Sequence, residues 1–265
     1  MQNAQMKQEA LIIIENRKNG VCKLTLNRPE SHNALSFQLL TDMKNALEKI
    51  KKNKNLRVLI IDANGPSFCS GHDLKEINSN NNKEIYKKLF NLCSQVMLSI
   101  IRLDIPVIAS VHSTATAAGC QLVATCDLAI ASENARFATP GVNIGLFCST
   151  PMVALSRNIS KKNSMEMLLT GDLIDSYKAK EFGLVNRVVP EKKLEQTVNE
   201  IAEKILQKSS KTIAVGKKAF YEQLELGVSE AYELTSMIMT ENMTEYNAQE
   251  GVEAFLKKRP PIWKD

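Results

Sequence analysis

Two turns rich in small residues constrain the fold of this 265-residue chain more than any other feature. The first lies in residues 67–76, SFCSGHDLKE, and the second in residues 117–121, AAGCQ. Each follows a strand-like segment and opens a helical pattern, and small residues stand where the backbone must approach something closely. If the fold places the turns side by side, two backbone N–H groups can point at one carbonyl oxygen. That arrangement is an oxyanion hole.

Strand and helix patterns alternate along the first two thirds of the chain. Apolar runs of strand length occupy residues 11–14, 21–26, 58–62, 106–111 and 127–131. Apolar residues at helical spacing predict one helix capped by Ser36 and others over residues 89–103 and 118–125, with a polar loop at 79–82. This repeat predicts a largely parallel α/β fold with ligands at the carboxyl ends of the strands.

The pattern changes after Val189 and Pro190, where helical signals dominate to the end. The spacing predicts helices over residues 194–206, 212–226, 229–247 and 250–257. We therefore expect an α/β core in residues 1–190 and a helical region in residues 191–265. A methionine-rich stretch, Met237, Ile238, Met239 and Met243, is expected to pack in the core or at a subunit interface.

Composition excludes several other classes. No apolar run approaches the ~20 residues of a membrane span, and the N-terminus lacks an apolar signal core, which favours the cytoplasm, with a processed organelle form as the alternative. The six cysteines form no CxxC pair and the three histidines are dispersed, so we expect neither disulfides nor a metal site. The net charge of +5 comes from scattered lysines that suit a solvated surface. It is also compatible with an anionic ligand such as a phosphate-rich cofactor.

Six motifs in order carry a family resemblance. They lie in residues 26–35, 68–76, 117–127, 168–171, 179–185 and 250–255. On these segments the chain resembles the crotonase, or enoyl-CoA hydratase/isomerase, superfamily. The resemblance implies an α/β core of repeated ββα units, a C-terminal helical region that forms homotrimers or hexamers, and an acyl-CoA ligand. It implies no permanently bound cofactor, because coenzyme A enters as part of the substrate.

The resemblance also assigns roles to individual residues. The oxyanion-hole donors would be the backbone N–H groups of His72 and Ala118. Phe255 and Lys258 would lie near the CoA phosphates of a neighbouring subunit's ligand. The full set of residues implied for CoA binding is Arg28, Ala34, Asp73, Leu74, Lys75, Phe255 and Lys258.

The chain departs from the family at the two positions where hydratases carry glutamates. Those positions hold Gln121 and Gly141 here. A glutamine amide exchanges no proton near neutral pH, and a glycine has no side chain. Because general acid–base help is worth roughly 10²- to 10⁴-fold, we expect no efficient hydration of an enoyl-CoA.

Several reactions and residues remain open. His72 stands where family decarboxylases carry histidine, so an enolate-forming decarboxylase or lyase is one hypothesis, although simple packing of this side chain is the alternative. Asn143 and Cys148 are further pocket candidates, whereas Asp127 is expected to make structural hydrogen bonds. A second hypothesis is a non-catalytic acyl-CoA-binding protein. RNA binding, a third, is disfavoured because no basic stretch is interleaved with aromatic residues.

Overall fold

The computed structural model describes residues 10–79 and 82–265. Its strands form two sheets, with orders β1-β2-β3-β5-β7-β10 and β4-β6-β8-β9. The strand bounds are β1 Ile12–Asn16, β2 Val21–Leu26, β3 Val58–Ala63, β4 Ser67–Cys69, β5 Val107–Val111, β6 Thr114–Thr116, β7 Leu128–Ser132, β8 Arg136–Ala138, β9 Ile174–Asp175 and β10 Arg187–Val189.

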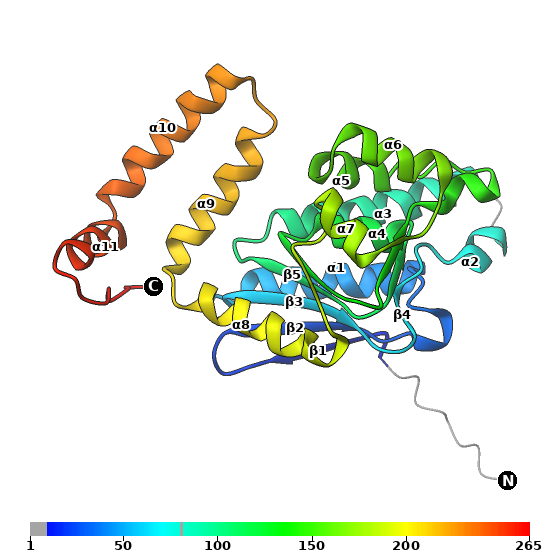
Figure 1. Cartoon of the computed structure of the whole chain (residues 1–265), viewed down its shortest axis with the longest axis horizontal. Helices are drawn as coiled ribbons and strands as arrows, with labels where there is room; N and C mark the ends of the chain where they lie inside the picture. Colours follow the sequence, from blue (N-terminus) through cyan, green and yellow to red (C-terminus); the bar gives the residue numbers. More distant parts are fainter. Residues whose placement is uncertain (1–9, 80–81) are drawn as a thin grey trace, which may run out of the picture.

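Helices α1 to α8 lie around these sheets, whereas α9, α10 and α11 extend away from them (Figure 1). Their bounds are α1 Phe37–Lys52, α2 Leu74–Ser79, α3 Lys83–Ile101, α4 Ala118–Thr125, α5 Pro151–Asn158, α6 Lys161–Thr170, α7 Ser176–Phe182, α8 Leu194–Leu206, α9 Ser210–Gln223, α10 Val228–Thr244 and α11 Tyr246–Leu256. Short 3₁₀ turns precede α1 (η1, Pro29–Ser31), α5 (η2, Pro140–Ile144) and α8 (η3, Glu191–Lys193). Among the described residues, no helix is long and apolar enough to cross a membrane.

The architecture repeats the expected ββα unit. In β3–β4–α2, β5–β6–α4 and β7–β8–α5, the first strand joins the larger sheet and the short second strand joins the smaller one. Within the larger sheet β2, β3, β5, β7 and β10 run parallel, and only β1 pairs antiparallel, in the hairpin with β2. The predicted α/β fold class is therefore confirmed, including α4 with its predicted bounds.

Apolar side chains cover both faces of the larger sheet. Helices α1 and α3 bury their apolar sides in the main core. On the other face, Val198 and Ala202 of α8 pack against Ile60, Ile108 and Ile130. Since α8 packs on the sheet, the helices that extend from the core begin with α9 (Figure 1). The boundary at residue 190 remains a prediction.

The C-terminal helices differ from the sequence-based expectation. The helix predicted over residues 229–247 ends at Thr244, and α11 begins at Tyr246 instead of residue 250. At the break, Glu245 is extended, with φ −73° and ψ 145°. Asn247 turns inward, where its side chain donates to Ser209 Oγ at 2.8 Å and accepts from the Lys264 N–H at 2.8 Å. This tertiary contact leaves no local signal in the sequence, which explains the wrong boundary.

The methionine-rich stretch is exposed in the single chain. Met237, Met239 and Met243 have exposed fractions of 56%, 61% and 45%. Packing in the core is thus wrong for these three side chains, and the subunit-interface alternative stays a prediction. The polar loop predicted at residues 79–82 lies partly outside the described residues, and Ser79 itself ends α2.

A buried ion pair fastens α9 to the core. Lys217 Nζ, on a side chain only 7% exposed, lies 2.6 Å from Asp127 Oδ2 and donates to the Ile105 carbonyl at 2.9 Å. Asp127 also accepts from the Tyr221 hydroxyl at 2.8 Å and the Val107 N–H at 2.7 Å. Burial lowers the pKa of Lys217, although the neighbouring carboxylate opposes that shift. The structural role expected for Asp127 agrees with these bonds.

Replacing Asp127 by asparagine should destabilise the protein strongly, because Lys217 would keep a buried charge without a counter-ion. We expect Asp127→Asn to lower the free energy of unfolding by about 3 kcal/mol in chemical denaturation. Lys54→Gln, at the exposed pair with Asp104, should change it by less than about 1 kcal/mol. Equal effects of the two variants would contradict this account.

Candidate functional site

The fold brings the two small-residue turns into contact. Strand β4 leads into the first turn, β6 leads into the second, and the two strands pair in parallel. A Cβ atom on Gly119 would lie 2.1 Å from the Cys69 carbonyl oxygen. A Cβ atom on Gly71, at φ +96°, would lie 2.8 Å from Ala117 Cβ and 3.2 Å from Ala118 N. Glycine is thus required at both positions by the close approach of the two backbones.

The two candidate donor N–H groups have no partner among the described residues. In the bridge between Leu35 and His72, the Leu35 N–H donates to Gly71 O at 2.7 Å and the Asp73 N–H donates to Leu35 O at 3.2 Å. Neither of these two bonds uses the His72 N–H. Ala118 is the first residue of α4, so its N–H has no acceptor within the helix. Because Ala118 is fully buried, this N–H is a rare unpaired buried donor.

Strain at Ala117 accompanies this donor. Ala117 has φ 49° and ψ −118°, a region that a residue with a Cβ atom rarely adopts. Its N–H donates to the Ala138 carbonyl at 2.9 Å, and its own carbonyl accepts from the Gln121 N–H at 3.0 Å. These bonds hold the turn in a conformation that costs of order 1–3 kcal/mol. Such strain is concentrated at functional sites, so it supports the assignment of a site here.

A charged pair supports the first turn. Arg28 donates to Asp73 Oδ2 at 2.7 Å and to the Ala34 carbonyl at 3.1 Å. Asp73 Oδ1 accepts from the N–H groups of Lys75 and Glu76 at the start of α2. Burial would raise the pKa of Asp73, but Arg28 and these backbone donors outweigh it and lower the pKa. Four of the residues implied for CoA binding, Arg28, Ala34, Asp73 and Lys75, therefore take part in the bonds that hold the turn itself.

The sequence analysis missed the importance of Asn33 in this support. Its side chain is fully buried, accepts from the Arg28 N–H at 2.7 Å, and donates to the carbonyls of Asn64 at 2.8 Å and Ser67 at 2.9 Å. The residue also has a positive φ of 53°. An asparagine four residues after a proline is a weak turn signal, and nothing in the sequence indicates its remote partners.

The His72 side chain is half-buried. Its ring lies edge-on to Phe90 at 5.2 Å between centroids, and Nε2 is sealed from solvent without a partner among the described residues. Burial lowers the pKa of His72 to about 4, so the imidazole is uncharged near neutral pH. These observations favour the packing interpretation of the side chain over a role in proton transfer.

The two positions that the resemblance assigns to the family glutamates, Gln121 and Gly141, carry no acid. Gln121 is buried, and its Oε1 has no partner within the described part of the chain. A Cβ atom on Gly141 would lie 2.6 Å from the Leu146 carbonyl oxygen and 2.9 Å from Cys148 Sγ. The Cys148 thiol and this carbonyl thus occupy the space beside Gly141. Burial raises the pKa of Cys148, although the Gly141 N–H opposes the shift, so the thiol stays protonated.

The other candidate residues are exposed. Asn143 is exposed, and its Nδ2 lies 3.0 Å from the Cβ position of Gly171 at the end of α6. Leu74 and Lys75 are exposed at the start of α2. Phe255, 83% exposed, lies near the end of α11, and Lys258 follows that helix.

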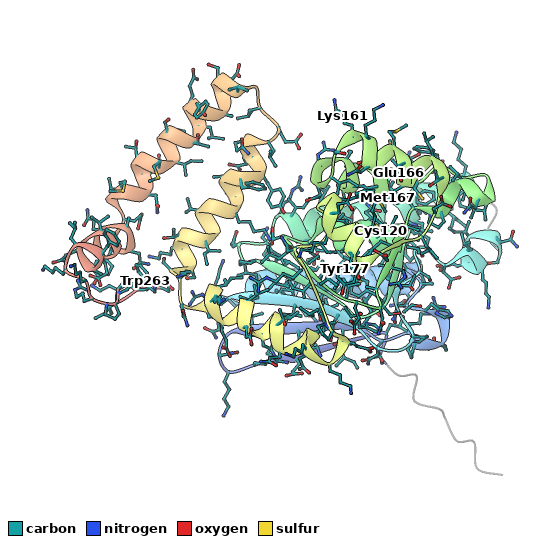
Figure 2. All side chains as sticks on the ribbon, viewed as in Figure 1. Cys120, Lys161, Glu166, Met167, Tyr177 and Trp263 are labelled. Atoms are coloured by element: carbon teal, nitrogen blue, oxygen red, sulfur yellow. The ribbon has the colours of Figure 1, made fainter. Side chains whose placement is uncertain are left out.

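Phe255 lies at a second location, on the C-terminal helices. It lines a cavity of about 570 Å³ with Trp263 and residues of α9, α10 and α11. Figure 2 places Trp263 far from Cys120, the neighbour of Gln121 in the α/β core. Within one chain, the structure therefore does not bring Phe255 and Lys258 to the turns.

Replacement of glycine by alanine should have opposite effects on stability at Gly119 and at Gly216. Gly119→Ala should lower the free energy of unfolding by about 3 kcal/mol or more, because the new methyl group would strike the Cys69 carbonyl. Gly216→Ala, in α9 with open space around its Cβ position, should raise it by up to about 1 kcal/mol. Denaturant titration of both variants tests this. Tolerance of Gly119→Ala would mean that the turns are not in contact.

The lowered pKa of His72 predicts a specific loss of stability in acid. The unfolded chain binds a proton at this side chain below about pH 6.5, while the folded chain resists it until about pH 4. Stability should therefore fall as the pH decreases through this window, by up to about 3 kcal/mol from this group. The free energy of unfolding of His72→Leu should lack that part of the slope. Parallel profiles for the two proteins would show that the imidazole is accessible.

Comparison with known proteins agrees with this geometry. The family described as enoyl-CoA hydratase/isomerase matches residues 16–265. Enoyl-CoA hydratase domain-containing protein 3, mitochondrial, of Xenopus laevis is 44% identical over 97% of this chain and 87% of its own length. The human protein of the same name has a crystal structure with TM-score 0.92 and 43% identity, covering 96% of this chain and all of that one.

A bacterial structure is equally similar. The enoyl-CoA hydratase of Mycobacterium smegmatis superposes with TM-score 0.95 and 48% identity, over 96% of this chain and 99% of that chain. The match of the family over nearly the whole chain agrees with the ββα repeat and with the two turns in contact. The chain belongs to the enoyl-CoA hydratase/isomerase family and has the crotonase fold.

Proposed function

We propose that this protein binds an acyl-CoA and polarises its thioester carbonyl with the backbone N–H groups of His72 and Ala118. The observation that carries the proposal is the unpaired, buried Ala118 N–H beside the turn that presents the His72 N–H. The positive end of α4 adds a favourable field for negative charge on the oxygen. The hydratase names of several relatives support the same ligand class.

The reaction that suits this site is enolate formation without the glutamate pair. In a decarboxylation, the bond to the departing carboxylate breaks, its electron pair forms the enolate, and carbon dioxide leaves. The two N–H groups would stabilise the enolate oxygen, and removing one such donor typically costs about 3 kcal/mol of barrier. A proton from water then completes the product. No step in this sequence needs a carboxylate at residue 121 or 141.

Binding without turnover is the second candidate. The uncharged imidazole of His72, with its solvent-sealed Nε2, and the protonated thiol of Cys148 favour it, because neither group is prepared to move a proton near neutral pH.

Exposed apolar groups on the C-terminal helices support self-association. Phe255 and Leu256 are 83% and 73% exposed, next to the exposed methionines of α10. We propose that these helices contact a second copy, in a homotrimer or a hexamer, and carry Phe255 and Lys258 towards a neighbouring ligand site. Since the similar vertebrate proteins are named mitochondrial, the mitochondrial alternative gains support over the cytoplasmic prediction.

A pair of matched ligands tests the carbonyl contact without altering the protein. Butyryl-CoA carries the thioester carbonyl, and S-butyl-CoA lacks only that oxygen. Calorimetry should show tighter binding of butyryl-CoA by about tenfold or more, because hydrogen bonds contribute about 0.5–1.5 kcal/mol each and more when the donor is otherwise unsatisfied. Equal affinities would exclude an oxyanion hole, and no binding of either ligand would refute the proposal.

Mass spectrometry over time then separates the two candidates. Incubation with malonyl-, methylmalonyl-, crotonyl- and 3-enoyl-CoA should give loss of carbon dioxide from malonyl- or methylmalonyl-CoA if the site forms enolates by decarboxylation. Retention of one ligand without any product favours the binding protein. Rapid addition of water to crotonyl-CoA would contradict the interpretation of Gln121 and Gly141.

A further inference from the structure

Side chains of one connector bind the backbone of the other connector beside the two turns. Residues 64–66 link β3 to β4 ahead of the first turn, and residues 112–113 link β5 to β6 ahead of the second. His112 Nε2 lies 2.8 Å from the Gly65 carbonyl oxygen, and Ser113 Oγ donates to the Pro66 carbonyl at 2.7 Å. Thr116 Oγ1, at the end of β6, donates to the Ser70 carbonyl at 3.0 Å. We refer to the His112, Ser113 and Thr116 side chains as the clamp.

All three contacts run in the same direction. Each acceptor is a backbone carbonyl of the segment that leads to the first turn, and each side chain comes from the segment that leads to the second. Because a carbonyl oxygen only accepts, the His112 Nε2 must carry the proton in this contact. The clamp therefore supplies three hydrogen-bond donors to the backbone on either side of β4.

Backbone hydrogen bonds alone fix the separation of β4 and β6 poorly. Strands β4 and β6 pair through Ser67 with Thr114 and through Cys69 with Ala115, and the register shifts between these two pairs. A three-residue strand with an irregular register gives few ladder bonds to set the separation of the turns. The clamp adds contacts before and after this short ladder.

Thr116 lies closest to the candidate donors. It directly precedes the strained Ala117, and its acceptor Ser70 directly precedes Gly71. A Cβ atom on Gly71 would lie 3.1 Å from the Thr116 carbonyl oxygen. The Thr116 hydroxyl bond and the absence of a side chain at Gly71 thus both affect the distance between the turn of His72 and the turn of Ala118.

We infer that His112, Ser113 and Thr116 are positioning residues that set the spacing of the His72 and Ala118 N–H groups. None of them needs to touch the ligand. The inference rests on the proposed acyl-CoA function, and it adds to that function the side chains that align the two halves of the hole. A misplacement of about 1 Å can cost about 10²-fold in a positioned reaction, so small shifts of the turns matter.

The test uses the carbonyl stretching frequency of bound butyryl-CoA labelled with ¹³C at the thioester carbon. Hydrogen bonding to the carbonyl lowers this frequency, so it reports on the two donors and not on folding. Thr116→Val keeps the shape and removes the hydroxyl, and it should lose about half of the wild-type shift and about 2- to 10-fold in affinity. Thr116→Ser should retain both. Ser113→Ala should act in the same direction as Thr116→Val.

The control is Thr41→Val, which removes a threonine hydroxyl bonded within α1. It should leave the frequency and the affinity unchanged, and melting curves check that each variant is folded. If the wild-type protein shows the shift and both Thr116→Val and Ser113→Ala keep it in full, the inference is wrong while the proposed function stands. If the wild-type protein binds butyryl-CoA without any shift, or does not bind it, the proposed function and the inference both fail.

Discussion

The site depends on the close approach of two backbones in the smaller sheet. Gly119 lies so near the Cys69 carbonyl that a methyl group would overlap it, and a Cβ atom on Gly71 would lie 2.8 Å from Ala117 Cβ. This contact exists because β4 and β6 are neighbours in a sheet separate from the one that holds β3 and β5. The larger sheet supplies the buried apolar core and its stability. Supported by this rigid core, the smaller sheet holds the strained turn at Ala117 and the unpaired Ala118 N–H.

Local patterns were sufficient to predict much of the fold. Apolar runs located β1, β2, β3, β5 and β7 of the larger sheet but not its edge strand β10. Ser36 located the start of α1, because N-capping is a local interaction. The bounds of α4 also matched, since a helix that begins at a small-residue turn has a clear first residue. The break at Glu245 and the anchoring of Asn247 were not predictable, because they depend on a tail segment distant in sequence.

The same distinction applies to the candidate site. The sequence suggested that the turns carrying His72 and Ala118 would face each other, and the structure places the turns in contact. It did not indicate the role of Asn33, or the contact of Cys148 with Gly141, because those depend on loops whose paths are set by tertiary packing. The edge-on contact of the His72 ring likewise depends on Phe90, which lies eighteen residues away on α3. Chemistry carried by a turn is thus easier to predict than chemistry that requires two loops to meet.

The use of backbone donors has a consequence for mutational surveys. The groups expected to contact the carbonyl belong to the main chain of His72 and Ala118, and every amino acid except proline carries the same N–H. An alanine scan would leave both donors in place, and at Ala118 it would make no change at all. Such a scan would report Arg28, Asp73 and Asn33, which hold the turns, and would assign importance to the supports instead of the site. The functional centre of this protein would be invisible to the method most often used to find one.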